Sequence, residues 1–437
     1  MIVFGLVLLG AVLAAPAGAQ QARGPIYTVQ VQAPITSVTT GYLRDALRQA
    51  ESADATALII TLSSSGGVLS DVRTFASDLA RANVPVVVYI APDGTNAGAP
   101  GTLLLSAADI SAMAPNTTIG SPYPLARVDA ALSQQTRDLV LDSVTTELRD
   151  WNATHGRNTD WLQRAVNEGA VLTNEQAAAL KPPAVDIVAT DQNQLLTLLQ
   201  GRTVKLATGK TVTLDTLGRA TTPFEPSLWQ SLRLTLANPT VAFALLIVGA
   251  LAIYLELAAP GTSIFAGVGV VLLIAAFSGL VTLPLQWWAM GLLLLGLLLL
   301  GFEFFIPTHG GLAILGLAAL VVGALNLIDP TQAPGASVAG WAVVLVAIGL
   351  AAFVIVGVLL IIRSRSVPVT TGQEGMVGKL AEVRERLDPE GMVFVEGALW
   401  QAISADGVIE KGDWVRVMNR HNLRLIVQRI EDTEETT

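Results

Sequence analysis

The feature that most constrains this chain is a long interval without any lysine or arginine. Neither lysine nor arginine occurs between Arg233 and Arg363. A membrane-spanning helix needs roughly 20 apolar residues, and the interval holds about five apolar runs separated by short turns rich in Pro and Gly. The runs are Val241–Leu257, Ile264–Leu283, Trp288–Ile306, Leu312–Ile328 and Val338–Ile362. The sequence therefore predicts an α-helical transmembrane bundle over 238–363, with about five spans in a lipid bilayer.

The amino end has the composition of a secretory signal. Residues Ile2 to Ala14 are almost entirely apolar, and Ala17-Gly18-Ala19 before Gln20 fits an A-x-A cleavage site. We expect a signal peptide at 1–19, the alternative being an uncleaved anchor helix. In either case the domain that follows is predicted to be exported.

The orientation of the chain follows from the span count and from the flanking charges. An exported domain followed by an odd number of spans places the carboxyl end in the cytosol. Arg363 and Arg365, just past the last run, agree with the positive-inside rule. We expect a multi-pass protein of the plasma (cytoplasmic) membrane, with an extracytoplasmic domain ahead of the spans and a cytosolic domain behind them.

Composition excludes several kinds of site. The chain has no cysteine, which excludes disulfides, thiolate zinc sites and a cysteine nucleophile. Its three histidines are His155, His309 and His421, too far apart in sequence to predict a metal site. The net charge of −9 argues against nucleic acid as a partner. We expect no cofactor and no metal.

The exported segment reads as alternating strands and helices. A short strand is predicted at Tyr27–Val31 and buried strands at Ala57–Leu62 and Val84–Ile90, with helical spacing over Thr40–Ala53 and Val72–Ala82 between them. This β-α-β-α-β order favours a parallel sheet with crossover helices. The predicted domain covers 20–225.

Five segments of this domain carry a family resemblance. They are Ser65-Gly66-Gly67, Val84-Pro85-Val86-Val87, Leu103 to Asp109, Ala112 to Gly120, and His155-Gly156-Arg157-Asn158. These segments resemble the ClpP/crotonase superfamily and, more narrowly, the long form of the NfeD family, which is described as membrane-bound serine proteases of the ClpP class. The resemblance also covers the membrane region and the tail, and it implies an α/β ClpP/crotonase-like fold for the exported domain.

The catalytic pair that this resemblance implies is absent from the sequence. The family nucleophile is the serine of a Ser-Ala-Gly-Thr motif, and the corresponding run here places Ala99 at that position. The family base is a lysine, and counting back from His155 places it near Leu139. Independently of register, the first lysine of the whole chain is Lys181.

What remains is a scaffold for acyl transfer with weak substitutes for the lost pair. The Gly66-Gly67 turn is able to aim backbone N–H groups at an oxyanion, although glycines there also simply allow a tight turn. Thr102 and Ser106 lie near the lost nucleophile, and His155 is the one histidine in the exported part. An inactive cleft of this kind could still hold a peptide by strand addition.

Two carboxylates fall near the ends of apolar runs. Glu256 and Glu303 each precede a proline, Pro260 and Pro307, by four residues. Intramembrane carboxylates usually mark function, but their cost falls near the membrane surface. An interfacial carboxylate beside a turn and a buried or proton-linked role are both open.

The composition changes again in the tail. Short alternating strands with glycine turns begin at Gly375–Lys379 and predict a small all-β barrel over 370–430. The pattern resembles the NfeD OB-like carboxyl-terminal domain. Residues 431–437 are acidic and are predicted to be disordered.

The first hypothesis is therefore a pseudoprotease scaffold, in which the OB-like domain binds a stomatin-like (SPFH/band-7) membrane protein in membrane organisation or quality control. The resemblance also implies homo-oligomers and a peptide in the exported cleft. Two alternatives stay open. One is an active membrane-bound serine protease of the ClpP class, and the other is a small ion-linked transporter using Glu256 and Glu303.

Overall fold

A computed structural model describes residues 20–21, 24–64, 66–120, 134–258, 261, 263–303, 305–306, 308, 310–365 and 373–430. The chain divides into two compact units, Met1–Val354 and Ile355–Thr437. The predicted signal peptide 1–19, His309, Pro260, Pro307 and the acidic tail 431–437 lie outside the described residues.

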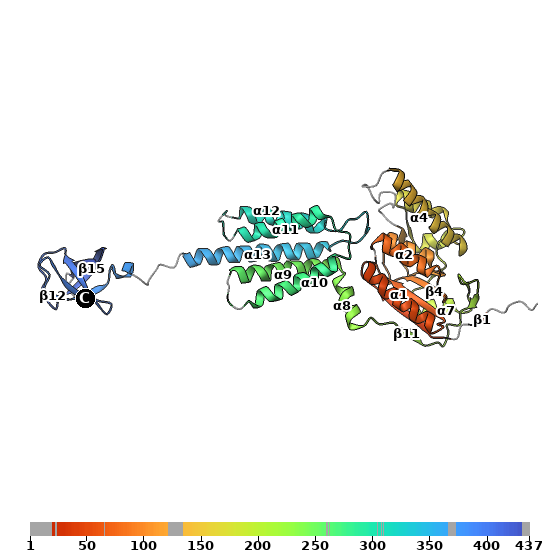
Figure 1. Ribbon diagram of the computed structural model, residues 1–437, viewed down its shortest axis with the longest axis horizontal. Helices are drawn as coiled ribbons and strands as arrows, with labels where there is room; N and C mark the ends of the chain where they lie inside the picture. Colours follow the sequence, from red (N-terminus) through yellow and green to blue (C-terminus); the bar gives the residue numbers. More distant parts are fainter. Residues whose placement is uncertain are drawn as a thin grey trace, which may run out of the picture. The chain divides into compact units, whose positions relative to one another are not determined.

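A six-stranded, wholly parallel sheet forms the centre of the first domain (Figure 1). Runs of β-branched and aliphatic residues build it, and its central strands are buried on both faces, as expected for parallel strands covered by helices. In spatial order the strands are β11 (Thr221–Pro223), β2 (Ile26–Val31), β3 (Ala57–Leu62), β4 (Val86–Ile90), β5 (Ile110–Met113) and β8 (Ile187–Val188).

The two faces of this sheet carry different layers. The helices that follow the strands pack on one face around Leu43, Phe75 and Leu104. They are α1 (Ser37–Ser52), α2 (Leu69–Leu79), α3 (Gly98–Ala107), α4 (Gln134–Thr154) and α5 (Asp160–Glu168). The opposite face is covered by α7 (Gln192–Leu199) and by a small sheet of β1 (Gln20–Gln21), β10 (Thr211–Thr213) and β9 (Thr203–Lys205). The ClpP-like α/β prediction is confirmed.

Three short elements complete this domain, and the first of them, β6 (Thr118–Gly120), contacts α3. Strand β6 pairs antiparallel with β7 (Val171–Thr173), and α6 (Asn174–Ala179) follows directly. A capping box at Thr173 and Gln176 starts α6.

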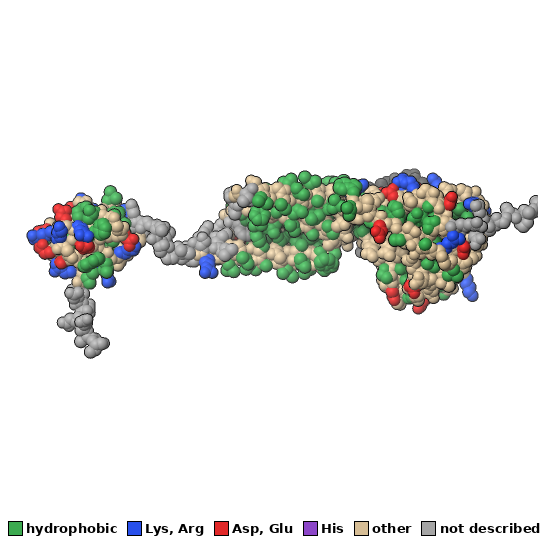
Figure 2. Space-filling view, turned by 90° about the horizontal axis from the view of Figure 1, so that it is seen from below, with side chains coloured by type: hydrophobic (Ala, Val, Ile, Leu, Met, Phe, Trp, Pro, Cys, Tyr) green, Lys and Arg blue, Asp and Glu red, His purple; other side chains and the backbone are tan. Residues whose placement is uncertain are grey.

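Apolar helices follow α8 (Leu228–Leu236). They are α9 (Pro239–Ala258), α10 (Ile264–Leu280), α11 (Trp287–Phe302), α12 (Gly311–Leu325) and α13 (Gly340–Arg365). Among the described residues, α9 and α13 are long and apolar enough to cross a membrane, while α10, α11 and α12 are shorter apolar helices. Hydrophobic side chains cover their surface (Figure 2), as lipid-facing helices require. The number of spans stays a prediction.

Helices α9 and α10, and likewise α11 and α12, form two hairpins that share one construction. In each hairpin a pair of glycines brings the two backbones together, since a Cβ on Gly269 would lie 2.7 Å from the Gly249 carbonyl oxygen and one on Gly316 would lie 2.8 Å from that of Gly296. Glu256 and Glu303 stand at the same distance in sequence after Gly249 and Gly296. Small residues at helix crossings are how membrane helices approach closely.

The carboxyl-terminal unit contains a closed five-stranded barrel in the order β12 (Leu380–Glu385), β13 (Glu390–Val395), β14 (Ala398–Ser404), β16 (Arg424–Arg429) and β15 (Trp414–His421). Strands β14 and β16 are parallel and the other pairs are antiparallel. This confirms the predicted OB-like barrel. The strand expected at Gly375–Lys379 is wrong, because Gln373–Met376 is a 3₁₀ helix and Gly378 has φ +88°.

Candidate functional site

The position expected to carry the nucleophile lies at the start of α3. Gly98, with φ +56°, turns the chain into the helix, and its N–H donates to the Asn96 side chain at 3.0 Å. Ala99 follows and is buried, 5% exposed. Glycine is required at position 101, because a Cβ there would lie 2.5 Å from the Cβ of Ala97. The backbone therefore presents a helix amino end, and the side chain it presents is a methyl group.

A small cavity of about 20 Å³ adjoins Ala99. That volume is of the order needed for a single water. Apart from Thr102 its lining is carbon and backbone: Ala99, Thr102, Leu103, Gly120, Leu148, Leu162, Ala165 and Val166. The described walls of this cavity hold no titratable side chain.

The Thr102 hydroxyl is already engaged within the fold. It donates to the Gly98 carbonyl at 2.8 Å and accepts from the Gly120 amide at 2.8 Å, and the residue is 6% exposed. A nucleophilic hydroxyl needs a base to take its proton. Here the proton is directed at a backbone carbonyl, so the geometry assigns Thr102 to joining α3 and β6.

Arg157 organises the opposite end of α3. Its guanidinium donates to the carbonyls of Leu105 and Ser106 at 3.1 and 3.2 Å, and to those of Ala108 and Asp109 at 2.8 and 2.9 Å. It also pairs with Asp186 at 2.7 Å, and its side chain is fully buried. These bonds satisfy the carbonyls that the helix end leaves unpaired.

His155 belongs to this opposite end. Its pKa is lowered to about 4 by burial first and by the Arg157 charge second, so the imidazole is neutral at pH 7. Arg157 contacts the carboxyl end of α3 and Ala99 lies at its amino end, so the two are separated by the length of the helix, about 15 Å. We therefore find no support for a Thr102–His155 pair. Ser106 is buried near this end of α3.

Two carboxylates of this network carried no signal in the sequence. Burial opposes the charge of Asp186, but Arg157 and the Ser111 amide and hydroxyl hold its pKa below the ordinary value. Burial raises the pKa of Asp109 to about 7, against a hydrogen bond from the Val86 amide and the Arg157 charge. Asp186 is 29 residues from Arg157 in sequence, and only the fold brings them together.

The expected lysine position falls on α4. Leu139 lies within this helix, but its side chain is outside the described residues. Lys181 is exposed in the segment before β8. No group of three His, Cys, Asp or Glu suited to a metal ion occurs in the part of the chain that the structure describes.

The Gly66-Gly67 turn lies between β3 and α2. Gly67 pairs with Ile35 on one side, where a Cβ on Gly67 would lie 2.6 Å from the Ile35 carbonyl oxygen. On the other side the Gly67 amide donates to the Pro334 carbonyl at 3.3 Å. The amide expected to face an oxyanion is therefore bonded to a segment between α12 and α13.

Glu256 and Glu303 cap the helices that follow them. Glu256 accepts from the amides of Gly261 and Ser263 at 3.2 and 2.9 Å. Glu303 accepts from the Gly310 and Ala313 amides at 2.8 and 3.1 Å. Negative charge at a helix amino end is stabilising, so both carboxylates have a structural explanation as caps of α10 and α12.

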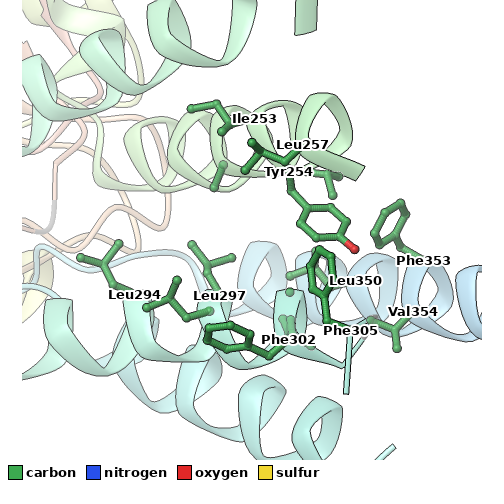
Figure 3. Close-up of a pocket in the computed structure, with 15 residues that line it drawn as sticks. Ile253, Tyr254, Leu257, Leu294, Leu297, Phe302, Phe305, Leu350, Phe353 and Val354 are labelled. Atoms are coloured by element: carbon green, nitrogen blue, oxygen red, sulfur yellow. The ribbon is translucent and has the colours of Figure 1, made fainter. Parts of the chain in front are cut away.

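An apolar cavity of about 530 Å³ lies among α9, α11 and α13. Figure 3 shows Tyr254, Leu297, Phe302 and Leu350 around it. The rings of Tyr254 and Phe353 meet edge to face with centroids 6.2 Å apart. Walls of this kind suit hydrocarbon and offer an ion no chain of polar groups, so this cavity does not support ion transport.

Comparisons with known proteins agree on one family. Residues 240–362 match the NfeD integral membrane domain, and residues 373–429 match the NfeD-like C-terminal, partner-binding domain. The membrane-bound protease PH1510 of Pyrococcus horikoshii is 29% identical over 416 residues, covering 93% of this chain and 94% of that protein.

Solved structures resemble each end of the chain. A variant of the 1510-N membrane-bound stomatin-specific protease, in complex with a substrate peptide, is 26% identical, with TM-score 0.43, and covers 48% of this chain and 96% of that one. The C-terminal domain of stomatin operon partner protein 1510-C from Pyrococcus horikoshii is 49% identical, with TM-score 0.14, over 14% of this chain and 98% of that one.

Proposed function

Since this chain belongs to the NfeD family, in the long form with a ClpP-like domain ahead of the membrane helices, we propose that it is a pseudoprotease scaffold. In this role the ClpP-like domain binds an extended peptide without cleaving it. The barrel binds a stomatin-like membrane protein, and the membrane helices hold the two activities in one chain.

The observation that carries the proposal is the chemistry around Ala99. Ala99, which the sequence comparison above assigns to the nucleophile position, carries only a methyl group, and apart from Thr102 the cavity beside it is lined by carbon and backbone. The Thr102 hydroxyl is bonded to Gly98 and Gly120. Removing the nucleophile of a serine protease lowers the rate on the order of a million-fold, whereas backbone recognition of a peptide does not need it.

The proposal of a partner is based on the barrel. Its residues match a domain described as partner-binding, and the similar protein from Pyrococcus horikoshii is a stomatin operon partner. We propose that this chain, too, binds a stomatin-like protein through the barrel. Deleting residues 373–430 should abolish copurification with such a partner while leaving the membrane helices intact.

The orientation proposed here places the ClpP-like domain outside the cytosol and the barrel inside. Its support is the absence of lysine and arginine from 234–362 and the presence of Arg363 and Arg365 after them. Protease protection in sealed, right-side-out membrane vesicles tests this directly: protease added outside should cut the ClpP-like domain and leave the barrel whole.

Activity is tested with a fluorophosphonate probe and casein on the full-length protein. The wild type should neither label nor cleave. The matched variant Ala99→Ser, Leu139→Lys should do one or both, which would establish an intact scaffold that lacks its reactive groups. Labelling of the wild type would instead support the alternative, an active protease like the similar membrane-bound protease, and the labelled residue would identify its nucleophile.

A further inference from the structure

The backbone edge formed by Gly66, Gly67, Val68 and Leu69 is bonded on both of its sides. On one side it pairs with its own domain, because Ile35 N–H donates to the Gly66 carbonyl at 3.0 Å and Val68 N–H donates to the Ile35 carbonyl at 2.8 Å. On the other side the amides of Gly67 and Leu69 point away from Ile35. Two amides spaced in this way are what an added strand would bind.

A segment of the membrane region occupies that second side. The Gly67 amide donates to the Pro334 carbonyl at 3.3 Å, and the Leu69 amide donates to the Gln332 carbonyl at 3.0 Å. The later donor, Leu69, thus bonds to the earlier acceptor, Gln332. Residues 332–334 therefore run antiparallel to residues 67–69. Both segments belong to the same compact unit, Met1–Val354.

Glycine at 66 is explained by this contact. A Cβ on Gly66 would lie 2.2 Å from the Gly335 carbonyl carbon and 2.3 Å from the Ala336 nitrogen. The three nearest atoms all belong to the loop and none to the ClpP-like domain. The φ of Gly66 lies outside the left-handed region. Glycine is therefore required at position 66 because the loop backbone approaches closely there, and not because the turn needs a left-handed backbone conformation.

The loop is held in shape before it reaches this edge. Asp329 accepts from the Thr331 amide at 2.9 Å and from the Gln332 side chain at 3.0 Å. Its own amide donates to the Pro284 carbonyl at 2.9 Å, in the connection between α10 and α11. Ala333 is fully buried. An ordered segment loses little conformational entropy on binding.

From these contacts we infer that the loop between α12 and α13 is an internal ligand of the peptide groove, bound as an added strand across Gly67 and Leu69. An external peptide must displace it, and must present a residue without a large side chain opposite Gly66. Because the loop joins α12 to α13, groove occupancy is coupled to the membrane helices. The gating of peptide binding rests on the proposed function, whereas the position of the loop does not.

A disulfide tests the position of the loop. Val68 and Ala333 face each other between the two hydrogen bonds, where Cα atoms of such a pair lie about 4.5 Å apart, within bridging range. The chain has no cysteine of its own, so Val68→Cys with Ala333→Cys is the only pair. In the full-length protein in membranes, mild oxidation should cross-link it.

Matched variants make the test specific to the contact. Adding Gly66→Ala to the cysteine pair should lower cross-linking by at least about tenfold, equivalent to about 1.4 kcal/mol. Adding Gly41→Ala should leave it unchanged, because nothing lies within 4 Å of a Cβ there. If both cysteines instead react freely with a maleimide and no cross-link forms, the inference is wrong.

The same protein tests gating. A fluorescent peptide with the sequence of residues 329–338 should bind after reduction and fail to bind after oxidation, with a scrambled peptide as the control. Equal binding in both states would overturn the gating inference. If the pair cross-links and the peptide binds in neither state, even at the millimolar concentrations that match the effective concentration of a tethered loop, the loop position stands and the peptide-binding function proposed above is wrong.

Discussion

The Thr102 hydroxyl accepts a hydrogen bond from the Gly120 amide at 2.8 Å, which ties the first helix turn after Ala99 to strand β6. The same oxygen donates to the Gly98 carbonyl. One hydroxyl thus satisfies two backbone groups where α3 meets β6. The role of Thr102 is therefore to stabilise this buried contact.

Replacing Thr102 with valine should destabilise the ClpP-like domain. The change leaves the buried Gly120 amide without a partner, at a cost of about 1–3 kcal/mol. Thr102→Ser keeps the hydroxyl and should cost less. Urea unfolding of the full-length protein, followed by limited proteolysis of this domain, measures both. A Thr102→Val variant that kept its stability but lost a measured protease activity would show Thr102 to be a nucleophile.

Arg157→Met should be among the most damaging single changes in this domain. It leaves Asp186 partly buried without its cation and frees four carbonyls at the end of α3 and start of β5. Breaking a buried ion pair from one side costs about 3–5 kcal/mol. Arg164→Met, at an exposed arginine, is the control. Equal unfolding midpoints for the two variants would contradict the role given to Arg157.

Asp109→Asn should flatten the decline of stability between pH 4 and pH 7. The folded pKa of Asp109 is raised to about 7 from 3.8, so the native state keeps a proton that the unfolded chain releases. Its contribution is complete below pH 4 and is lost as the pH rises toward 7, by up to about 1.4 kcal/mol per pH unit. Asparagine can still accept from the Val86 amide.

The measurement compares wild type and Asp109→Asn at pH 5 and pH 7.5. His155, whose pKa is lowered to about 4, has the opposite effect: its contribution is present above pH 6.5 and falls as the pH drops to 4. It is shared by both proteins, so the difference between them isolates Asp109. Parallel pH profiles would mean that Asp109 is ionised in the native state throughout.

Gly316→Ala should loosen the α11–α12 hairpin. The new methyl would lie 2.8 Å from the Gly296 carbonyl oxygen, and overpacking of this kind costs about 1–3 kcal/mol. Gly291→Ala in the same hairpin meets nothing within 4 Å, and it should be neutral or favourable. Thermal stability in detergent distinguishes them. Gly269→Ala and Gly267→Ala repeat the comparison in α9–α10.

Glu303→Gln should weaken the α11–α12 turn. We expect no ion flux through either the wild type or this variant. Both carboxylate oxygens accept hydrogen bonds, from the Thr308 hydroxyl and from backbone amides, whereas a glutamine would turn a donor toward donors. We expect a loss of about 1–3 kcal/mol in detergent. Flux in liposomes that the wild type supports and Glu303→Gln or Glu256→Gln removes would instead establish the transporter alternative.

Local chemistry made several features of this protein readable from the sequence alone. Apolar runs without lysine or arginine form helices α9 to α13. In lipid the backbone N–H and C=O groups find no water, and a helix pairs them within the segment. The β-α alternation yields a parallel sheet because two parallel strands must be joined by a crossover connection, and a helix supplies it. The absence of lysine before Lys181 is a property of composition that no fold alters.

Tertiary structure decided what lies beside each of these residues. The Thr102 hydroxyl, the Arg157–Asp186 pair and the contact of Gly67 with Pro334 each join positions far apart in the chain, and a hydrogen bond depends on distance and direction that residue order does not encode. Gly66 shows the difference most plainly. In the sequence it indicates a turn, and in the folded protein it makes room for the backbone of Gly335, 269 residues later in the chain.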